Sequence, residues 1–209
     1  MPILTEISVN RTCATLLFDD RTHLTVRKSD LAACPVQVGD EVDTDAYAGR
    51  VCAHQFKDSF DAALSILDYS ARTQREIEKK LLAKGFLPDC VSAVLERLRE
   101  TRLIDDREIA LRAAEFASAG KTGIYALKRK LRARGIRESD VEDALETISD
   151  EDQLAAAAAV AKKLAPRYEG RDPREAHAKL SQALARRGFS WSVIEQTLSM
   201  PDMDDTDFT

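Results

Sequence analysis

The spacing of apolar residues changes near residue 56 and separates a short N-terminal segment from a longer helical one. Before this point, apolar residues alternate in short runs around Asp19-Asp20-Arg21, which is typical of a hairpin of two or three strands. The runs contain Ile7, Val9, Leu16, Phe18, Leu24 and Val26. Residues 30–33 are predicted to form a helical turn, and 35–42 a turn that enters a short strand. Because so small a sheet is marginal alone, we expect it to pack on the next helix.

From residue 56 onward the chain contains three copies of one pattern, aligned on the glycines Gly85, Gly135 and Gly188. Counted from each glycine, apolar residues recur eight and four positions before it, and one, six and ten positions after it. They are Ile77, Leu81, Phe86, Val91 and Leu95; Leu127, Leu131, Ile136, Val141 and Leu145; and Leu180, Leu184, Phe189, Ile194 and Leu198. Five matched positions in three copies predict a repeat protein.

The spacing within one copy predicts a pair of helices joined at the glycine. Positions eight and four before it lie one turn apart on one helix face, and the glycine supplies the left-handed residue that ends the helix. Leu81, Leu131 and Leu184, together with the three glycines, are therefore assigned to structure. A further helix is predicted ahead of each pair, over 60–69, 107–119 and 153–168, and Thr73 with Glu76 forms the pattern of a capping box.

These elements predict a mainly α fold, a tandem array of three three-helix repeats with a small N-terminal β-hairpin extension. Because one unit buries little apolar surface, neighbouring repeats should stack into an elongated, curved array. The predicted boundaries are 1–55 for the extension, 56–104, 105–149 and 150–200 for the three repeats, and 201–209 for a disordered acidic tail.

Composition supports a helical protein and offers no catalytic site. The chain has 209 residues with only 8 Gly and 6 Pro, and its histidines and cysteines are scattered without metal-ligand spacing. No nucleophile motif or phosphate-binding glycine loop is present. We therefore expect no enzyme, no metal and no cofactor. No apolar run approaches the roughly 18 residues of a membrane span, and we expect a cytoplasmic protein without membrane contact.

The second copy contains a basic stretch, although the net charge of the chain is −5. Residues 127–137 contain six basic residues and no acidic one. The residue before each glycine is basic in every copy (Lys84, Arg134 and Arg187), where a cation complements the helix dipole, so this position needs no ligand. Lys128, Arg129 and Arg132 differ in kind from most of their counterparts in the other copies, which indicates that helix formation does not require them.

With Leu127 and Leu131 inward, Lys121, Lys128, Arg129 and Arg132 fall on one outward helix face at about 100° per residue. Such a face is often simply solvated. No acidic residue occurs from Lys121 to Arg137, however, so these cations should repel one another by a few tenths of a kcal/mol per pair, and an external anion would relieve the repulsion. We take them as candidate contacts with a partner, together with Lys79 of the first copy and Arg186 of the third.

The order and spacing of these motifs resemble those of the RecX family, regulators of the RecA recombinase. The resemblance covers almost the whole chain, including Leu103-Ile104-Asp105-Asp106. It further includes residues 4–7, 63–77, 80–86, 131–136 and 186–190. It implies tandem three-helix repeats, no catalytic centre, and a protein that binds in the groove of the RecA filament on single-stranded DNA. There it would inhibit ATP hydrolysis and strand exchange and favour filament disassembly.

Two functional hypotheses follow. In the first, the protein is a monomer that modulates the RecA filament, and the basic residues contact RecA carboxylates or DNA. In the second, the three-helix units act like helix-turn-helix modules that bind DNA on their own. The acidic overall charge argues against strong binding to DNA alone, because that affinity depends on neutralised phosphates. We therefore expect the RecA filament as partner, with single-stranded DNA bound weakly or through RecA.

Overall fold

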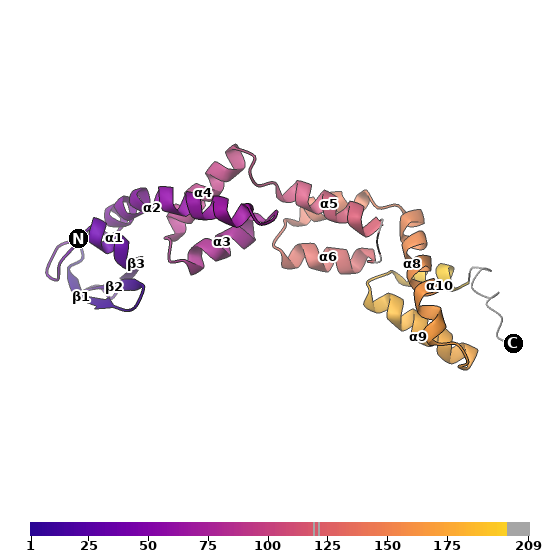
Figure 1. Ribbon diagram of the computed structural model, residues 1–209. Helices are drawn as coiled ribbons and strands as arrows, with labels where there is room; N and C mark the ends of the chain where they lie inside the picture. The colour runs from indigo at the N-terminus through magenta and orange to yellow at the C-terminus, as the bar shows by residue number, and fades with distance from the viewer. Residues whose placement is uncertain (119, 121, 200–209) are drawn as a thin grey trace. The chain divides into compact units, whose positions relative to one another are not determined.

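The computed structural model describes residues 1–118, 120 and 122–199, and the chain divides into two compact units at Asp105/Asp106 (Figure 1). The first unit contains strands β1 (Leu4–Val9), β2 (Cys13–Phe18) and β3 (His23–Arg27), and helices α1 (Lys28–Ala33), α2 (Thr44–Leu67), α3 (Gln74–Ala83) and α4 (Pro88–Glu100). The second contains helices α5 (Asp106–Ser118), α6 (Ile124–Ala133), α7 (Glu138–Glu146), α8 (Asp150–Leu164), α9 (Pro173–Arg186) and α10 (Trp191–Leu198), with a 3₁₀ turn, η1 (Ala165–Arg167), after α8. The mainly α fold is confirmed.

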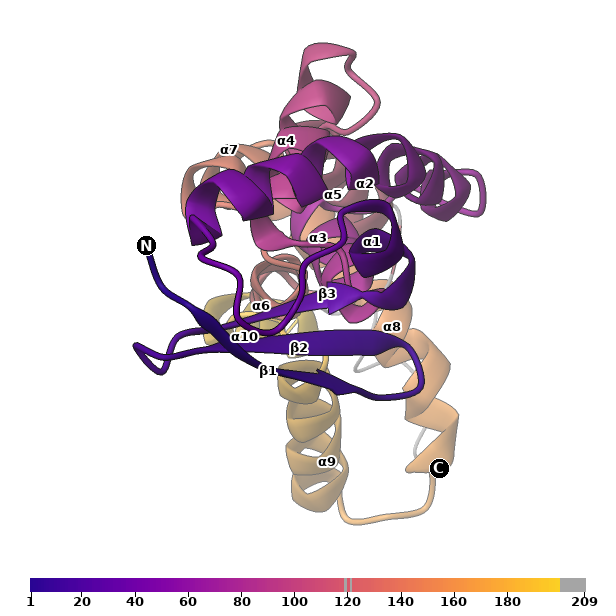
Figure 2. The ribbon, with the colours of Figure 1, turned by 90° about the vertical axis from the view of Figure 1, so that its left-hand side faces the viewer.

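The N-terminal strands form an antiparallel sheet in the order β1-β2-β3, which confirms the predicted hairpin. Its alternation directs one face inward, where Leu16 and Val26 are fully buried. This face packs on Tyr47 and Val51 of α2, and Figure 2 shows α1 and α2 on the same side of the sheet. The sheet thus obtains its core from the following helix, as expected.

Helix α2 begins earlier than the pattern predicted, at Thr44 rather than near residue 60. Asp43 caps it by accepting hydrogen bonds from the backbone N–H groups of Asp45 and Ala46. The buried stripe of α2 includes two polar residues, Gln55 and Ser59, and these interrupted the apolar period in the sequence. The helix therefore runs across the boundary drawn at 55/56 and belongs to both the extension and repeat 1.

The strand predicted within residues 35–42 is wrong in extent. Glu41 forms only an isolated bridge with Ile3. Pro35 and the turn at Gly39, which has φ +102, leave little extended backbone for a ladder. The tail predicted over 201–209 lies outside the described residues.

The three repeats have the predicted helix pairs: α3 with α4, α6 with α7, and α9 with α10. Gly85, Gly135 and Gly188 have φ values of +83, +82 and +85. In each case the glycine N–H and the next N–H donate back to carbonyl groups of the last helical turn, as in Gly85 to Leu82 and Phe86 to Leu81. This pattern of two hydrogen bonds is the Schellman motif, and it confirms that the glycines end these helices.

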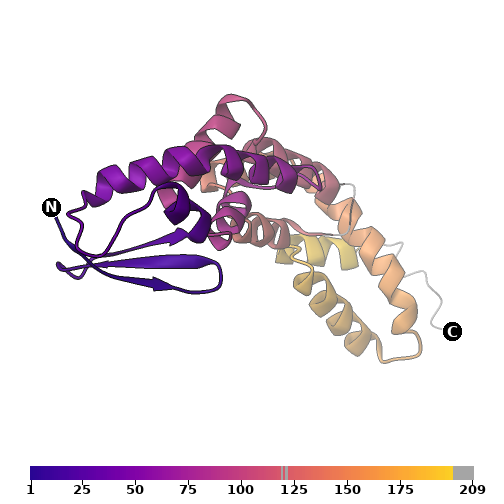
Figure 3. The ribbon, with the colours of Figure 1, turned by 60° about the vertical axis from the view of Figure 1, so that its left-hand side comes forward.

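Each repeat has its own apolar core, to which the matched positions contribute. Leu81, Leu131 and Leu184 are almost completely inaccessible to solvent. A third helix closes each core: the C-terminal half of α2 in repeat 1, α5 in repeat 2 and α8 in repeat 3. Figure 3 shows α8 and α9 side by side, joined by the loop after η1.

Candidate partner-binding surface

Helix α6 carries the cations that the sequence indicated as a partner contact. Leu127 and Leu131 are buried and fix the orientation of the helix. Lys128, Arg129 and Arg132 lie on its other side, where Arg129 and Arg132 are exposed and Lys128 is half-buried. We call these three residues the basic face of α6. Lys121, the fourth predicted member, lies outside the described residues.

Two residues of the basic face form ion pairs with helix α7. Lys128 Nζ lies 3.0 Å from Glu138 Oε1 and 3.8 Å from Glu142 Oε1. Arg132 donates from Nε to Glu138 Oε2 at 2.7 Å and pairs with the second oxygen through Nη2. The Schellman turn at Gly135 makes these contacts possible, because it reverses the chain and lays α7 against α6. The uncompensated repulsion expected from the sequence is therefore wrong for Lys128 and Arg132.

The ion pairs with Lys128 and Arg132 change the pKa of Glu138. Hydrogen bonds from Arg132 and then Lys128 lower the pKa of Glu138 to about 2. The same bond to Glu138 raises the pKa of Arg132. Since the folded-state pKa of Glu138 lies below its ordinary value of 4.5, the pairing is fully present above pH 4.5 and is lost only as the pH falls toward 2.

Arg129 differs from the other two members of the basic face, because no carboxylate of the described residues pairs with it. It is exposed and forms no ion pair within residues 1–118, 120 and 122–199. Its neighbour one turn earlier, Tyr125, has 61% of its surface exposed. An aromatic ring beside an unpaired arginine is a common surface for stacking on nucleobases or binding acidic groups. Tyr125 was not among the contacts predicted from the sequence, although its spacing of three and four residues from Lys128 and Arg129 places it on the same face.

Two further predicted contacts lie on other helices. Lys79 is exposed on α3, in the other unit. Arg186 is exposed near the end of α9, where its Nε donates to the carbonyl of Gln182 at 3.4 Å. The structure therefore brings together Lys128, Arg129 and Arg132 of the predicted set.

The N-terminus of α6 is held by repeat 3. The N–H of Gly123 donates to the carbonyl of Arg187 at 2.9 Å, and that of Tyr125 to Gly188 at 3.0 Å. Between them, the Ile124 N–H donates to Gln153 Oε1 at 3.0 Å. Three N–H groups that a helix start leaves unpaired are thus satisfied by neighbouring segments. This connection sets the orientation of the basic face relative to repeat 3.

Two classes of site are not found in the part of the chain that the structure describes. It contains no group of three or more His, Cys, Asp or Glu side chains placed to hold a metal ion. None of its helices combines the length and apolarity needed to cross a membrane.

Comparison with known proteins identifies the repeats. Residues 60–98 match the description "RecX, first three-helix domain", and residues 150–198 match "RecX, third three-helix domain". The Regulatory protein RecX of Limosilactobacillus reuteri is 30% identical over 194 residues, which are 90% of this chain and 74% of that protein. The chain belongs to the RecX family. The Regulatory protein RecX of Bacillus licheniformis is 29% identical over 99% of this chain and 80% of its own length.

Solved RecX structures share the fold. One crystal structure of regulatory protein RecX superposes with a TM-score of 0.67 at 28% identity, covering 96% of this chain and 100% of that one. RecX from Lactobacillus salivarius gives the same TM-score at 29% identity over 73% of this chain and 98% of its own. The resemblance stated from the sequence is confirmed, and with it the assignment to a family of regulatory proteins.

Proposed function

We propose that this RecX-family protein regulates the RecA recombinase by binding in the groove of the RecA filament on single-stranded DNA. It inhibits ATP hydrolysis, strand exchange and filament growth, and so modulates recombination, repair and the SOS response. Membership of the RecX family, over nearly the whole chain, is the observation that carries this proposal. In this proposal the protein is a cytoplasmic monomer that acts by contact and not by catalysis.

The basic face of α6 is the proposed contact with the filament. Arg129 supplies an unpaired guanidinium, and Tyr125 supplies an exposed ring next to it. Lys128 and Arg132 contribute less charge than their number suggests, because Glu138 already neutralises part of it. The partner groups are RecA carboxylates or DNA phosphates, both of which an arginine fork can bind. Lys79, Lys121 and Arg186 remain proposed secondary contacts.

The proposal predicts that the purified protein lowers RecA ATPase activity on single-stranded DNA at substoichiometric amounts. A regulator that acts on a filament affects many RecA subunits at once, so inhibition should be clear well below one protein per RecA. The measurement is the steady-state ATPase rate against protein concentration, with strand exchange as a second assay. Unchanged rates at equimolar protein would refute the proposal. Tight binding to DNA without any effect on RecA would favour an autonomous DNA-binding protein.

A single charge reversal tests the basic face. Replacing Arg129 with Glu should raise the concentration needed for half-inhibition by about tenfold, which corresponds to about 1.4 kcal/mol for one lost charge-assisted contact. Lys130→Glu is the matched control, because Lys130 is the next residue on α6 and is also exposed but lies off the face. Reversing Lys128 or Arg132 is less informative, because either change sets two carboxylates against each other.

Folding is checked by comparing the melting temperatures of the two variants. Arg129 and Lys130 form no ion pair in the described residues, so both should melt close to the parent protein. Equal losses of inhibition in both variants would indicate a diffuse charge effect. No loss in Arg129→Glu would show that the basic face is not the contact.

A further inference from the structure

Among the described residues, a small cavity in repeat 3 is lined by three cations and no acid. Its volume is about 180 Å³, and its walls are Val160, Lys163, Leu164, Arg167 and Arg187. It does not include any residue of the basic face of α6. The sequence analysis assigned Arg187 to helix capping and did not consider Lys163 or Arg167.

Four of the five wall residues come from one stripe of α8 and η1. Val160, Lys163, Leu164 and Arg167 follow the spacing of three, four and seven residues that places side chains on one helix face. Val160 and Leu164 are buried and form an apolar floor, while the two cations are exposed at the rim.

Arg187 reaches the same cavity from the end of α9. Its Nη1 donates to the carbonyl of Ala183 at 2.9 Å, and its own carbonyl accepts from the Gly123 N–H at 2.9 Å. The residue is thus fixed at both backbone and side chain. Since a guanidinium has five N–H donors, most of them remain for a ligand.

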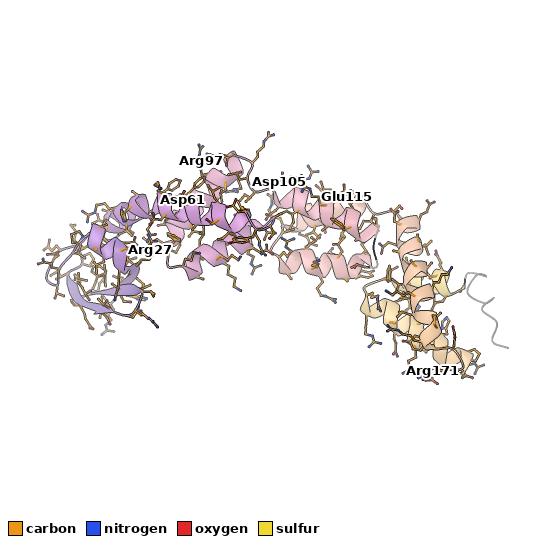
Figure 4. The ribbon with its side chains drawn as sticks, in the orientation of Figure 1. Arg27, Asp61, Arg97, Asp105, Glu115 and Arg171 are labelled. Atoms are coloured by element: carbon orange, nitrogen blue, oxygen red, sulfur yellow. The ribbon has the colours of Figure 1, made fainter. Side chains whose placement is uncertain are left out.

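The cations at the rim have no counter-ion among the described residues. Lys163 and Arg167 form no ion pair within the described part of the chain. Arg171, four residues after Arg167, pairs with Glu175 at 2.8 Å, and Figure 4 marks it at the turn between α8 and α9. Charge compensation by a carboxylate therefore occurs next to the cavity but not in it. An anion from outside would offset the repulsion among the three like charges that line the cavity.

The size of the cavity and the arrangement of its cations favour one kind of anion over others. A volume of 180 Å³ is below the roughly 300–1,000 Å³ of a pocket for a drug-sized ligand, so the cavity suits one small anionic group and not a whole nucleotide. One arginine fork satisfies a planar carboxylate, whereas cations from two separate elements suit a tetrahedral group with several acceptor oxygens. The apolar floor can contact the carbon atoms of a sugar.

We propose that the cavity formed by Lys163, Arg167 and Arg187 binds a backbone phosphate of nucleic acid. This site does not depend on RecA, and it is separate from the α6 contact. It assigns to α8 and η1 a role in holding a strand, and it adds Arg187 to the proposed contacts of repeat 3.

The test uses the full-length chain and a fluorescein-labelled oligothymidylate of about 30 nucleotides, with RecA absent. The test variant is Lys163→Gln with Arg167→Gln, which leaves the capping residue Arg187 intact. The control variant is Lys162→Gln with Arg174→Gln, which removes the same charge, one lysine and one arginine, from exposed positions outside the cavity. Fluorescence anisotropy gives the affinity at several salt concentrations, and melting temperatures confirm that both variants fold.

The test variant should bind roughly 10- to 30-fold more weakly at about 0.1 M salt. The slope of log affinity against log salt should fall by about 1.4, which is roughly 0.7 for each lost contact to a single strand. In the control variant, the affinity and the salt slope should both change much less. Equal losses of affinity in the two variants would overturn the proposal, because they would indicate that the oligonucleotide responds to the overall positive charge of the surface and not to the cavity.

Two further arms decide the source of the anion. Inorganic phosphate at about 1 mM should not displace the oligonucleotide, and displacement would overturn the assignment to a strand in favour of a small free anion. Binding to RecA without DNA should be the same for test and control variants. If only the test variant loses RecA binding while oligonucleotide binding is unchanged, the cavity binds a protein carboxylate and the proposal is wrong. Neither outcome depends on whether the protein inhibits RecA.

Discussion

Replacing Gly188 with Ala is expected to lower the free energy of unfolding of the second unit by about 3 kcal/mol or more. Gly188 has φ +85, where an L side chain is strained. In addition, a Cβ atom at this position would lie 2.2 Å from the backbone nitrogen of Ala126 and 2.5 Å from its Cβ. Helix α6 would have to move away, which would break the bond from the Tyr125 N–H to the Gly188 carbonyl.

Gly170→Ala separates the two causes. Gly170 also has a positive φ, +78, but a Cβ there would meet nothing within 4 Å. Gly170→Ala should therefore lower the free energy of unfolding only by the backbone strain, about 1 kcal/mol. Urea denaturation followed by circular dichroism measures both variants. Equal midpoints for the two would show that the contact between α6 and repeat 3 is not tight. If the contact is as described, Gly188→Ala should also weaken RecA inhibition, because α6 carries the basic face.

Asp30→Ala is expected to destabilise the first unit by about 3 kcal/mol at neutral pH. Asp30 is fully buried and accepts hydrogen bonds from Arg27 Nε at 2.8 Å, Arg27 Nη2 at 2.7 Å and Gln55 Nε2 at 2.6 Å. Gln55 in turn accepts from the Leu87 N–H at 2.8 Å. Removing the carboxylate leaves a buried amide donor and a partly buried guanidinium without their acceptor.

The same guanidinium supplies a control. Arg27, labelled in Figure 4, also contacts Asp58 at 3.4 Å, but the Asp58 side chain is 59% exposed. Asp58→Ala should therefore cost less than about 1 kcal/mol. Chemical denaturation of both variants measures the difference. A similar cost for the two substitutions would show that burial of Asp30 does not strengthen its contacts.

Acid should reduce the effect of Asp30→Ala. Burial by itself would raise the pKa of Asp30, but hydrogen bonds from Arg27 and Gln55 outweigh it and hold the pKa below its ordinary value of 3.8. A lowered folded-state pKa stabilises the protein fully above the unfolded-state value, and this contribution is lost as the pH falls below it. The stability difference between parent and variant should thus be constant from pH 7 to about 5 and shrink below about pH 4.

The repeats were predictable because their signals are local. A glycine that ends a helix and leucines one turn apart act within a few residues, and the structure has them where the pattern indicated. Where a local signal was interrupted, the prediction failed: Gln55 and Ser59 lie in the buried stripe of α2 and concealed its first half. Those residues are buried because partners from other elements, Asp30 and Cys90 among them, satisfy their polar atoms.

The basic stretch shows how far sequence alone could lead to a site. Its composition and its difference from the other copies indicated α6, but the counter-ion Glu138 is the residue immediately after that stretch and pairs only because the chain reverses at Gly135. Arg129 was therefore distinguishable from Lys128 and Arg132 only in three dimensions.

By itself, the sequence determined the ends of the helices that stop at Gly85, Gly135 and Gly188, the repeat and its register, since backbone conformation and amphipathic spacing depend on near neighbours. The tertiary structure alone decided which charges are neutralised, how α6 is attached to repeat 3, and which cations surround one cavity. Lys163 and Arg187 are far apart in the chain, and the pairing of charges depends on distance through space.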